Sequence, residues 1–168
     1  MTVSVENNAP FRCDVVGSFL RPGVLKQARA DFAAGTISAE QLKTVEDVAI
    51  RDLVAKQKAA GLKVVTDGEF RRSYWHLDFM WGLQGIERRT SREGYMFHDE
   101  ETTADTAVVV GPISGENHPF VNHFKFTQAL AGEGHSARQT IPAPIQTFSE
   151  VTLDRCDGQQ ESLRSVYA

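Results

Sequence analysis

The sequence has 168 residues, of which 41% are hydrophobic and 24% are charged, and its formal net charge is −4. These values are typical of one globular domain with its own core, and the negative charge argues against binding to nucleic acid or to an anionic membrane. No apolar run is long enough to cross a bilayer, and the first ten residues lack the apolar stretch of a signal peptide. We therefore expect a cytoplasmic protein in which Cys13 and Cys156 are free thiols.

The first part of the chain predicts an arm, a strand and a helix within a single domain that covers residues 1–168. Residues 1–11 are expected to form a loose N-terminal arm, and Cys13–Val16 is a candidate strand. A helix is predicted to begin at Pro22, because proline suits a first helical position where no N–H is needed. Gly35 suits the position just after the end of that helix.

A second, longer helix is predicted from a capping box. Ser38 can accept a hydrogen bond from the backbone of Gln41, and the Gln41 side chain can reach back to Ser38. Apolar residues then recur at helical spacing up to Gly61, and Leu62–Thr66 follows as a short apolar strand. Because helices separate this strand from the first one, the order favours parallel strands joined by a right-handed crossover.

A cluster of charged residues follows the second strand, at Asp67, Glu69, Arg71 and Arg72. Charge just past the C-terminal end of a buried strand is typical of ligand sites in α/β proteins. Asp-Gly is also a common hairpin turn, so a hairpin is the alternative. A helix precedes the strand and no alternating strand follows it, which favours the ligand site.

The rest of the chain predicts further elements. The aromatic stretch Ser73–Trp81 is either a short packing helix or the wall of a pocket, and we interpret residues 82–106 as an irregular excursion that can hold a β-hairpin. Ala107–Gly111 is the clearest buried strand, Phe120–Leu130 is a helix, and Arg138–Ile141 is a fourth strand. About four βα units result, whereas a closed eight-stranded barrel takes about 250 residues. The predicted fold class is therefore α/β, the N-terminal half of a (β/α)8 TIM-barrel type.

Several motifs, taken together and in order, resemble one known family. The chain is similar to the catalytic barrel of cobalamin-independent methionine synthase, and more closely to the short, single-barrel branch of that family. The similarity spans roughly residues 12–148 and includes these stretches: Val15–Phe19, Ile37–Glu40, Asp67–Arg72, Val110–Ser114 and Thr140–Pro144.

The resemblance implies a TIM barrel related to uroporphyrinogen decarboxylase and an activity that transfers a methyl group from a methylated folate to the thiol of homocysteine, giving methionine. It implies that Val16, Gly17 and Ser18 hold the carboxylate of the amino acid and that Glu69 binds its ammonium group. Turns with exposed N–H groups suit anions, and a fixed carboxylate suits an ammonium group. The alternatives are that Ser18 only caps a helix and that Glu69 only pairs at the surface with a following arginine. No catalytic residue is assigned in this chain.

The zinc of the family is held by a His-x-Cys pair, a glutamate and a later cysteine, and this sequence contains no His-x-Cys. We therefore predict no metal ligand here and expect this chain alone to lack methyltransferase activity. The family's folate contacts correspond to Thr102, Thr103 and about Glu150, which are different residues, so another methyl or alkyl donor is an alternative to methylated folate.

Three hypotheses remain open from the sequence. The chain can be one part of a thiol methyltransferase, completed by a C-terminal-half partner. It can be a non-catalytic amino-acid-binding protein whose open sheet edges pair with another copy. It can also be a truncated piece of a longer chain. The first two require that the bend near Gly17 and the acid at Glu69 converge on one zwitterion.

Overall fold

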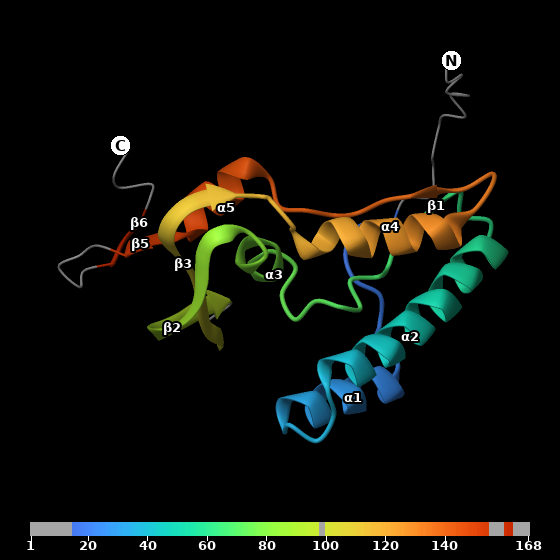
Figure 1. Ribbon diagram of the computed structural model, residues 1–168, viewed down its shortest axis with the longest axis horizontal. Helices are drawn as coiled ribbons and strands as arrows, with labels where there is room; N and C mark the ends of the chain where they lie inside the picture. Colours follow the sequence, from blue (N-terminus) through green and yellow to red (C-terminus); the bar gives the residue numbers. More distant parts are fainter. Residues whose placement is uncertain (1–14, 98–99, 155–159, 163–168) are drawn as a thin grey trace, which may run out of the picture. The chain divides into compact units, whose positions relative to one another are not determined.

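The computed structural model describes residues 15–97, 100–154 and 160–162, and the arm expected at residues 1–11 lies outside them. The chain divides into two compact units (Figure 1). Unit 1 consists of Met1–Arg71 and His123–Thr140, and unit 2 consists of Arg72–Asn122 and Ile141–Ala168. A single domain over residues 1–168 stays a prediction.

Two neighbouring helices form much of unit 1, α1 (Gly23–Ala33) and α2 (Ala39–Ala59), shown in blue and teal in Figure 1. Gly35 follows the end of α1 with a φ of 72°, so the predicted glycine stop is confirmed. The capping box at the start of α2 is also confirmed. The Gln41 N–H donates to Ser38 Oγ over 3.2 Å, and the Ser38 N–H donates to Gln41 Oε1 over 2.7 Å.

The sheet of unit 1 is one parallel pair, β1 (Val64–Val65) with β4 (Ser136–Ala137). The parallel arrangement is confirmed, but the placement of the fourth strand at Arg138–Ile141 is wrong. Pairing ends earlier than expected, with the hydrogen bond from the Arg138 N–H to the Val65 carbonyl oxygen, because β1 leads into a turn with positive φ at Gly68 and Glu69. The sheet packs with α1, α2 and α4 (Pro119–Ala131) around a core of buried side chains: Leu25, Ile50, Leu53, Val54, Val65, Phe70 and Ala131.

Of the first expected strand, Cys13–Val16, only residues 15 and 16 are described, and they are not in a strand. The α/β class is confirmed by the helices and the parallel pair of unit 1. The described elements do not close into a barrel.

Unit 2 contains a four-stranded sheet in the order β2-β3-β5-β6. The strands are β2 (Gln84–Phe97), β3 (Glu100–Ser114), β5 (Thr152–Asp154) and β6 (Gln160–Ser162). β2 and β3 pair antiparallel, β3 and β5 pair parallel, and β5 and β6 pair antiparallel. The hairpin that the sequence allowed in residues 82–106 is therefore present, and its strands are regular elements that continue to Ser114.

The strand predicted at Ala107–Gly111 exists as part of β3, which pairs antiparallel with β2 on one side and, at Val108 and Val109, parallel with β5 on the other. The count of about four βα units stays a prediction. Gly85 shows why the two strands can approach: its φ is 77°, and a Cβ there would lie 2.4 Å from the Pro112 carbonyl oxygen. Only glycine fits this close approach of two backbones.

The aromatic stretch contains the short helix α3 (Leu77–Trp81), as predicted, and unit 2 also contains α5 (Pro144–Glu150). The rings of Tyr74 and Trp81 meet edge to face with centroids 6.0 Å apart beside the core of unit 2. Among the helices of the described residues, none has the length and hydropathy needed to cross a bilayer.

Candidate functional site

The end of β1 is fixed by a side chain from α2. The Gln57 amide donates to the Thr66 carbonyl oxygen over 2.8 Å and accepts from the Thr66 N–H over 3.0 Å. The alternate carbonyls, those of Lys63 and Val65, accept from the β4 segment, so Thr66 presents its backbone to the opposite side. Gln57 therefore satisfies backbone groups that a neighbouring strand would otherwise satisfy.

The turn after β1 has an unusual backbone. Gly68 and Glu69 both have positive φ, 65° and 57°, and a residue other than glycine seldom adopts that region. Two side chains stabilise the turn: Asp67 Oδ1 accepts from the Glu69 N–H over 2.9 Å, and Thr66 Oγ1 accepts from the Gly68 N–H over 3.2 Å. Because β1 pairs with β4, the hairpin alternative for this Asp-Gly is wrong.

The structure brings the bend at residues 16–18 next to this turn. The Phe19 N–H donates to the Gly68 carbonyl oxygen over 3.1 Å, and the Arg21 guanidinium donates to the Glu69 carbonyl oxygen over 2.9 Å. Ser18 does not cap α1, since Pro22 is the residue at that helix start. The two regions predicted to hold one zwitterion therefore lie together, whereas the binding roles of Val16, Gly17, Ser18 and Glu69 stay predictions.

The side chain of Glu69 is buried, with 7% of the residue exposed, and its Oε1 accepts from Thr140 Oγ1 over 2.9 Å. A surface ion pair as its only role is therefore excluded by its burial. The nearby Arg71 side chain donates to Glu46 over 3.0 Å and to Asp47. The sequence did not predict the hydrogen bond from Thr140 to Glu69, because the only signal was that Thr140 lies near the end of an expected strand.

The charges behind the turn come from α1 and α2. Arg29 donates to the Phe70 carbonyl oxygen over 2.7 Å and lies 3.5 Å from Glu46. Burial raises the pKa of Glu46, although the attraction of Arg71 and Arg29 opposes the rise. Burial acts in the same direction on Asp47, but hydrogen bonds from Arg71 and Lys43 outweigh it and lower the pKa of Asp47. The arginines therefore anchor the far end of the turn to two helices.

His118 in unit 2 is a structural residue. Its Nε2 lies 2.9 Å from the Phe79 carbonyl oxygen, and its Nδ1 lies 3.1 Å from the Phe120 N–H. A carbonyl only accepts, so Nε2 carries the hydrogen and Nδ1 accepts, which makes the ring neutral.

The described residues do not fit the family's zinc site. Within them, no three side chains of histidine, cysteine, aspartate or glutamate are grouped so that they could hold a metal ion. A closed or catalytic zinc site takes at least three such ligands.

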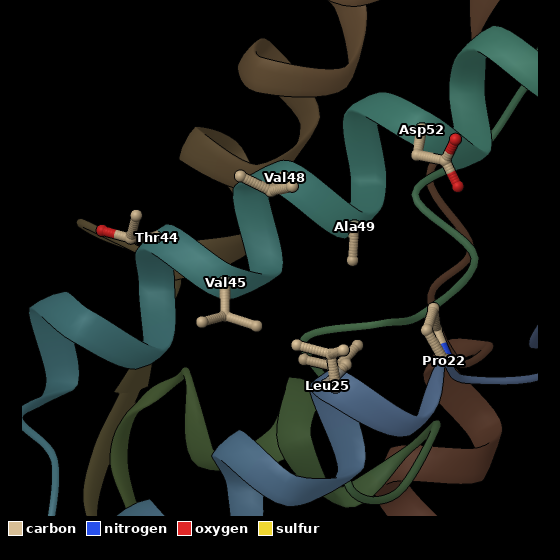
Figure 2. Close-up of a pocket in the computed structure, with 8 residues that line it drawn as sticks. Pro22, Leu25, Thr44, Val45, Val48, Ala49 and Asp52 are labelled. Atoms are coloured by element: carbon tan, nitrogen blue, oxygen red, sulfur yellow. The ribbon is translucent and has the colours of Figure 1, made fainter.

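Two apolar pockets, each about 370 Å³ in volume, lie elsewhere in the two units. The pocket in unit 1 is formed by α1 and α2, where Leu25 faces Val45 and Ala49 (Figure 2). The pocket in unit 2 is lined by residues from several segments: Phe79, Ile113, Ile141, Pro142, Pro144, Thr147, Phe148 and Val151. Neither pocket is lined by a residue predicted to bind the substrate.

Comparison with known proteins gives a consistent result. Residues 11–155 match the model of the catalytic domain of cobalamin-independent synthase. The chain is 43% identical over 158 residues to YxjH of Bacillus subtilis, an uncharacterized protein, and this match covers 93% of the chain and 42% of YxjH. It is also 27% identical over 144 residues to a 5-methyltetrahydropteroyltriglutamate–homocysteine methyltransferase from Rhodopseudomonas palustris, covering 86% of the chain and 18% of that enzyme.

Solved structures with a similar fold lead to the same family. A Listeria monocytogenes protein provisionally assigned as a vitamin-B12 independent methionine synthase is 39% identical, with a TM-score of 0.70, over 86% of this chain and 41% of that one. A B12-independent methionine synthase from Shewanella, solved with selenomethionine, is 25% identical with a TM-score of 0.55 over 72% of this chain and 34% of that one. The chain thus spans about two fifths or less of the length of these relatives.

Proposed function

Because this chain belongs to the cobalamin-independent methionine synthase family, we propose that it carries the amino-acid-binding part of a methyltransferase that converts homocysteine to methionine. The relative from Rhodopseudomonas palustris is a homocysteine methyltransferase by name, and the Shewanella relative was solved with selenomethionine. We also propose that unit 1 belongs to a TIM barrel, completed by residues beyond this match or by a partner chain. Methylated folate or another donor supplies the methyl group.

The observation that carries the proposal is the contact between the bend and the acidic turn. The Phe19–Gly68 hydrogen bond holds the bend at residues 16–18 beside Glu69, whose carboxylate is positioned by Thr140. In the proposal, the N–H groups of the bend and the Ser18 hydroxyl bind the carboxylate of homocysteine, and Glu69 binds its ammonium group.

These residues would act by orientation. An amino acid held at both its carboxylate and its ammonium group has a side chain with few accessible directions, so its thiol is aligned for attack on a methyl donor. When it is bound, the zinc of the family would favour the thiolate form of the homocysteine thiol. Its ligands would come from outside the described residues. The part of this chain in the reaction is therefore to bind and align the substrate.

Titration calorimetry of L-homocysteine with the wild type and Glu69→Gln tests the proposal. The glutamine keeps an oxygen for the Thr140 hydroxyl but removes the charge that would bind the ammonium group. A lost charge-assisted hydrogen bond is worth about 1.5–3 kcal/mol, so we expect Kd to rise about 10-fold to 150-fold. Glu40→Gln, at an exposed glutamate in the first turn of α2, is the matched control and should bind as the wild type does. Equal affinities for Glu69→Gln and the wild type would remove Glu69 from this role.

A further inference from the structure

Three buried side-chain atoms at the ends of β1 and β4 have no hydrogen-bond partner among the described residues: Asp67 Oδ2, Gln139 Oε1 and Gln139 Nε2. Asp67 is 3% exposed. Buried polar atoms in folded proteins nearly always have partners, because burial without one is unfavourable. Two such residues at adjoining strand ends therefore indicate a place where a ligand supplies the partners.

The register of the sheet places these two residues beside the proposed site. Val65 pairs with Ala137, and the pairing continues with the Arg138 N–H donating to the Val65 carbonyl oxygen. Asp67 and Gln139 each follow the Val65–Ala137 pair by two residues along parallel segments. The next side-chain contact between the same segments is the one from Thr140 to Glu69. Asp67 lies two residues before Glu69, and Gln139 directly precedes Thr140, whose hydroxyl contacts the carboxylate that is proposed to bind the substrate.

The carboxylate of Asp67 requires a donor of a particular kind. In the described part of the chain its only hydrogen-bond partner is the Glu69 N–H, at Oδ1, and no lysine, arginine or histidine there forms an ion pair with it. A buried carboxylate is stabilised by a cation that also donates hydrogen bonds. An ammonium group has three N–H donors and can be shared by two carboxylates.

We propose that Asp67 and Gln139 are further ligand-binding residues, in which Asp67 Oδ2 accepts a hydrogen bond from the ammonium group that Glu69 also binds, and the Gln139 amide pairs with polar atoms of the same ligand. This inference rests on the proposed function, and it makes Asp67 a residue that selects for a primary ammonium group. The ligand class is the α-amino acids, and acids of the same length without an amino group are rejected.

Asp67→Asn tests the proposal because Oδ1 of Asp67 has a hydrogen-bond partner whereas Oδ2 has none among the described residues. The asparagine keeps an oxygen to accept from the Glu69 N–H, so the turn is preserved, and it replaces the unpartnered oxygen with an NH₂ group that cannot accept. The asparagine also removes a buried negative charge that has no cationic partner among the described residues. The melting temperature should therefore stay unchanged or rise. Gln139→Met likewise removes two unpartnered polar atoms at similar size, and we expect no loss of stability from it.

The experiment measures the affinities of L-homocysteine and 4-mercaptobutanoate, which lacks the amino group, by calorimetry on the full chain. We expect Asp67→Asn to weaken homocysteine binding about tenfold or more and to change 4-mercaptobutanoate binding less than about twofold. Gln139→Met should weaken homocysteine binding about threefold or more. Asp52→Asn, at an exposed aspartate of α2, should change neither affinity.

Two results would overturn the inference. If Asp67→Asn weakens both ligands equally, Asp67 acts only through the shape of the turn. If Glu69→Gln loses homocysteine affinity while Asp67→Asn and Gln139→Met do not, the proposed function stands and the added contacts are wrong. A wild type that binds no homocysteine would instead remove the proposed function and this inference together.

Discussion

Replacement of Arg71 by methionine should destabilise unit 1 strongly, because it leaves a buried carboxylate without its main partner. The Arg71 side chain is 6% exposed and that of Glu46 is 10% exposed, and their charged atoms are 3.0 Å apart. Asp47 is the second acid bound by Arg71. Methionine keeps most of the alkyl packing near Phe126, over whose ring the guanidinium lies, but it removes the charge.

The expected magnitude follows from the burial. Removal of one partner of a buried ion pair costs about 3–5 kcal/mol. Glu46 keeps Arg29 at 3.5 Å, and Asp47 is partly exposed, so we take the lower end, about 3 kcal/mol. For a chain of this length, 1 kcal/mol corresponds to about 2–4 °C, and the melting temperature should therefore fall by about 6–12 °C.

The loss should depend on pH in a defined direction. Burial already raises the pKa of Glu46 above its ordinary value of 4.5, and without Arg71 it should rise further. A carboxyl group whose pKa is higher when folded holds its proton more tightly in the folded state, so folding is favoured as the pH falls from neutrality toward 4.5. The deficit of Arg71→Met relative to the wild type should therefore shrink on mild acidification.

Urea denaturation followed by far-ultraviolet circular dichroism measures the effect, since the helices of unit 1 dominate that signal. Arg51→Met is the matched control, because Arg51 lies over the same Phe126 ring but is exposed, and it should cost less than about 1 kcal/mol. Adding Glu46→Gln to Arg71→Met should recover part of the loss. The reasoning is refuted if Arg71→Met costs no more than Arg51→Met, or if the second substitution makes it worse.

Gly68 and Gly82 allow further tests of close packing, with Gly35 as the control for Gly68. Gly68→Ala should cost about 2–4 kcal/mol, because its φ is 65° and its Cβ would lie 2.4 Å from Leu53 Cδ2. Gly35→Ala, with a φ of 72° and open surroundings, should cost only about 1–2 kcal/mol, and equal losses in urea denaturation would contradict the packing argument. Gly82→Ala should cost about 1–3 kcal/mol, because its Cβ would lie 2.6 Å from His118 Nε2. Tryptophan fluorescence during denaturation measures this, and the loss should be smaller in a chain that also carries His118→Ala.

The elements that could be predicted from the sequence are those set by neighbours in the chain. The capping box of Ser38 and Gln41 and the stop at Gly35 depend on residues within one helical turn, and both are confirmed. The burial of Glu46 could not be predicted, because the arginines that stabilise it lie 17 and 25 residues away. A helix pattern alone places such a glutamate on the exposed face.

The strands likewise combine features set by nearby residues with features set by distant ones. The β-branched run at Ala107–Gly111 indicated a strand correctly, and Ala107 and Val108 are buried while Val110 is exposed. Its composition is equally compatible with a parallel and an antiparallel partner. The antiparallel partner requires the close approach of Gly85 to Pro112, which no local pattern reveals. β3 has a partner of each kind, β2 antiparallel and β5 parallel, so the sequence predicted the strand but not its neighbours.

The candidate site depends on both kinds of information. The Asp-Gly-Glu motif identified the acid, but Glu69 is buried and oriented by contacts from separate segments: Gln57 holds the end of β1, Phe19 binds the turn, and Thr140 binds the carboxylate. Because these partners lie 12, 50 and 71 residues from Glu69 in sequence, a peptide with the motif alone has no means to hold the acid in place. A short motif therefore supplies the acidic residues of the site, whereas their positions depend on the fold of unit 1. That is why the unpartnered oxygen of Asp67 became visible only in the structure.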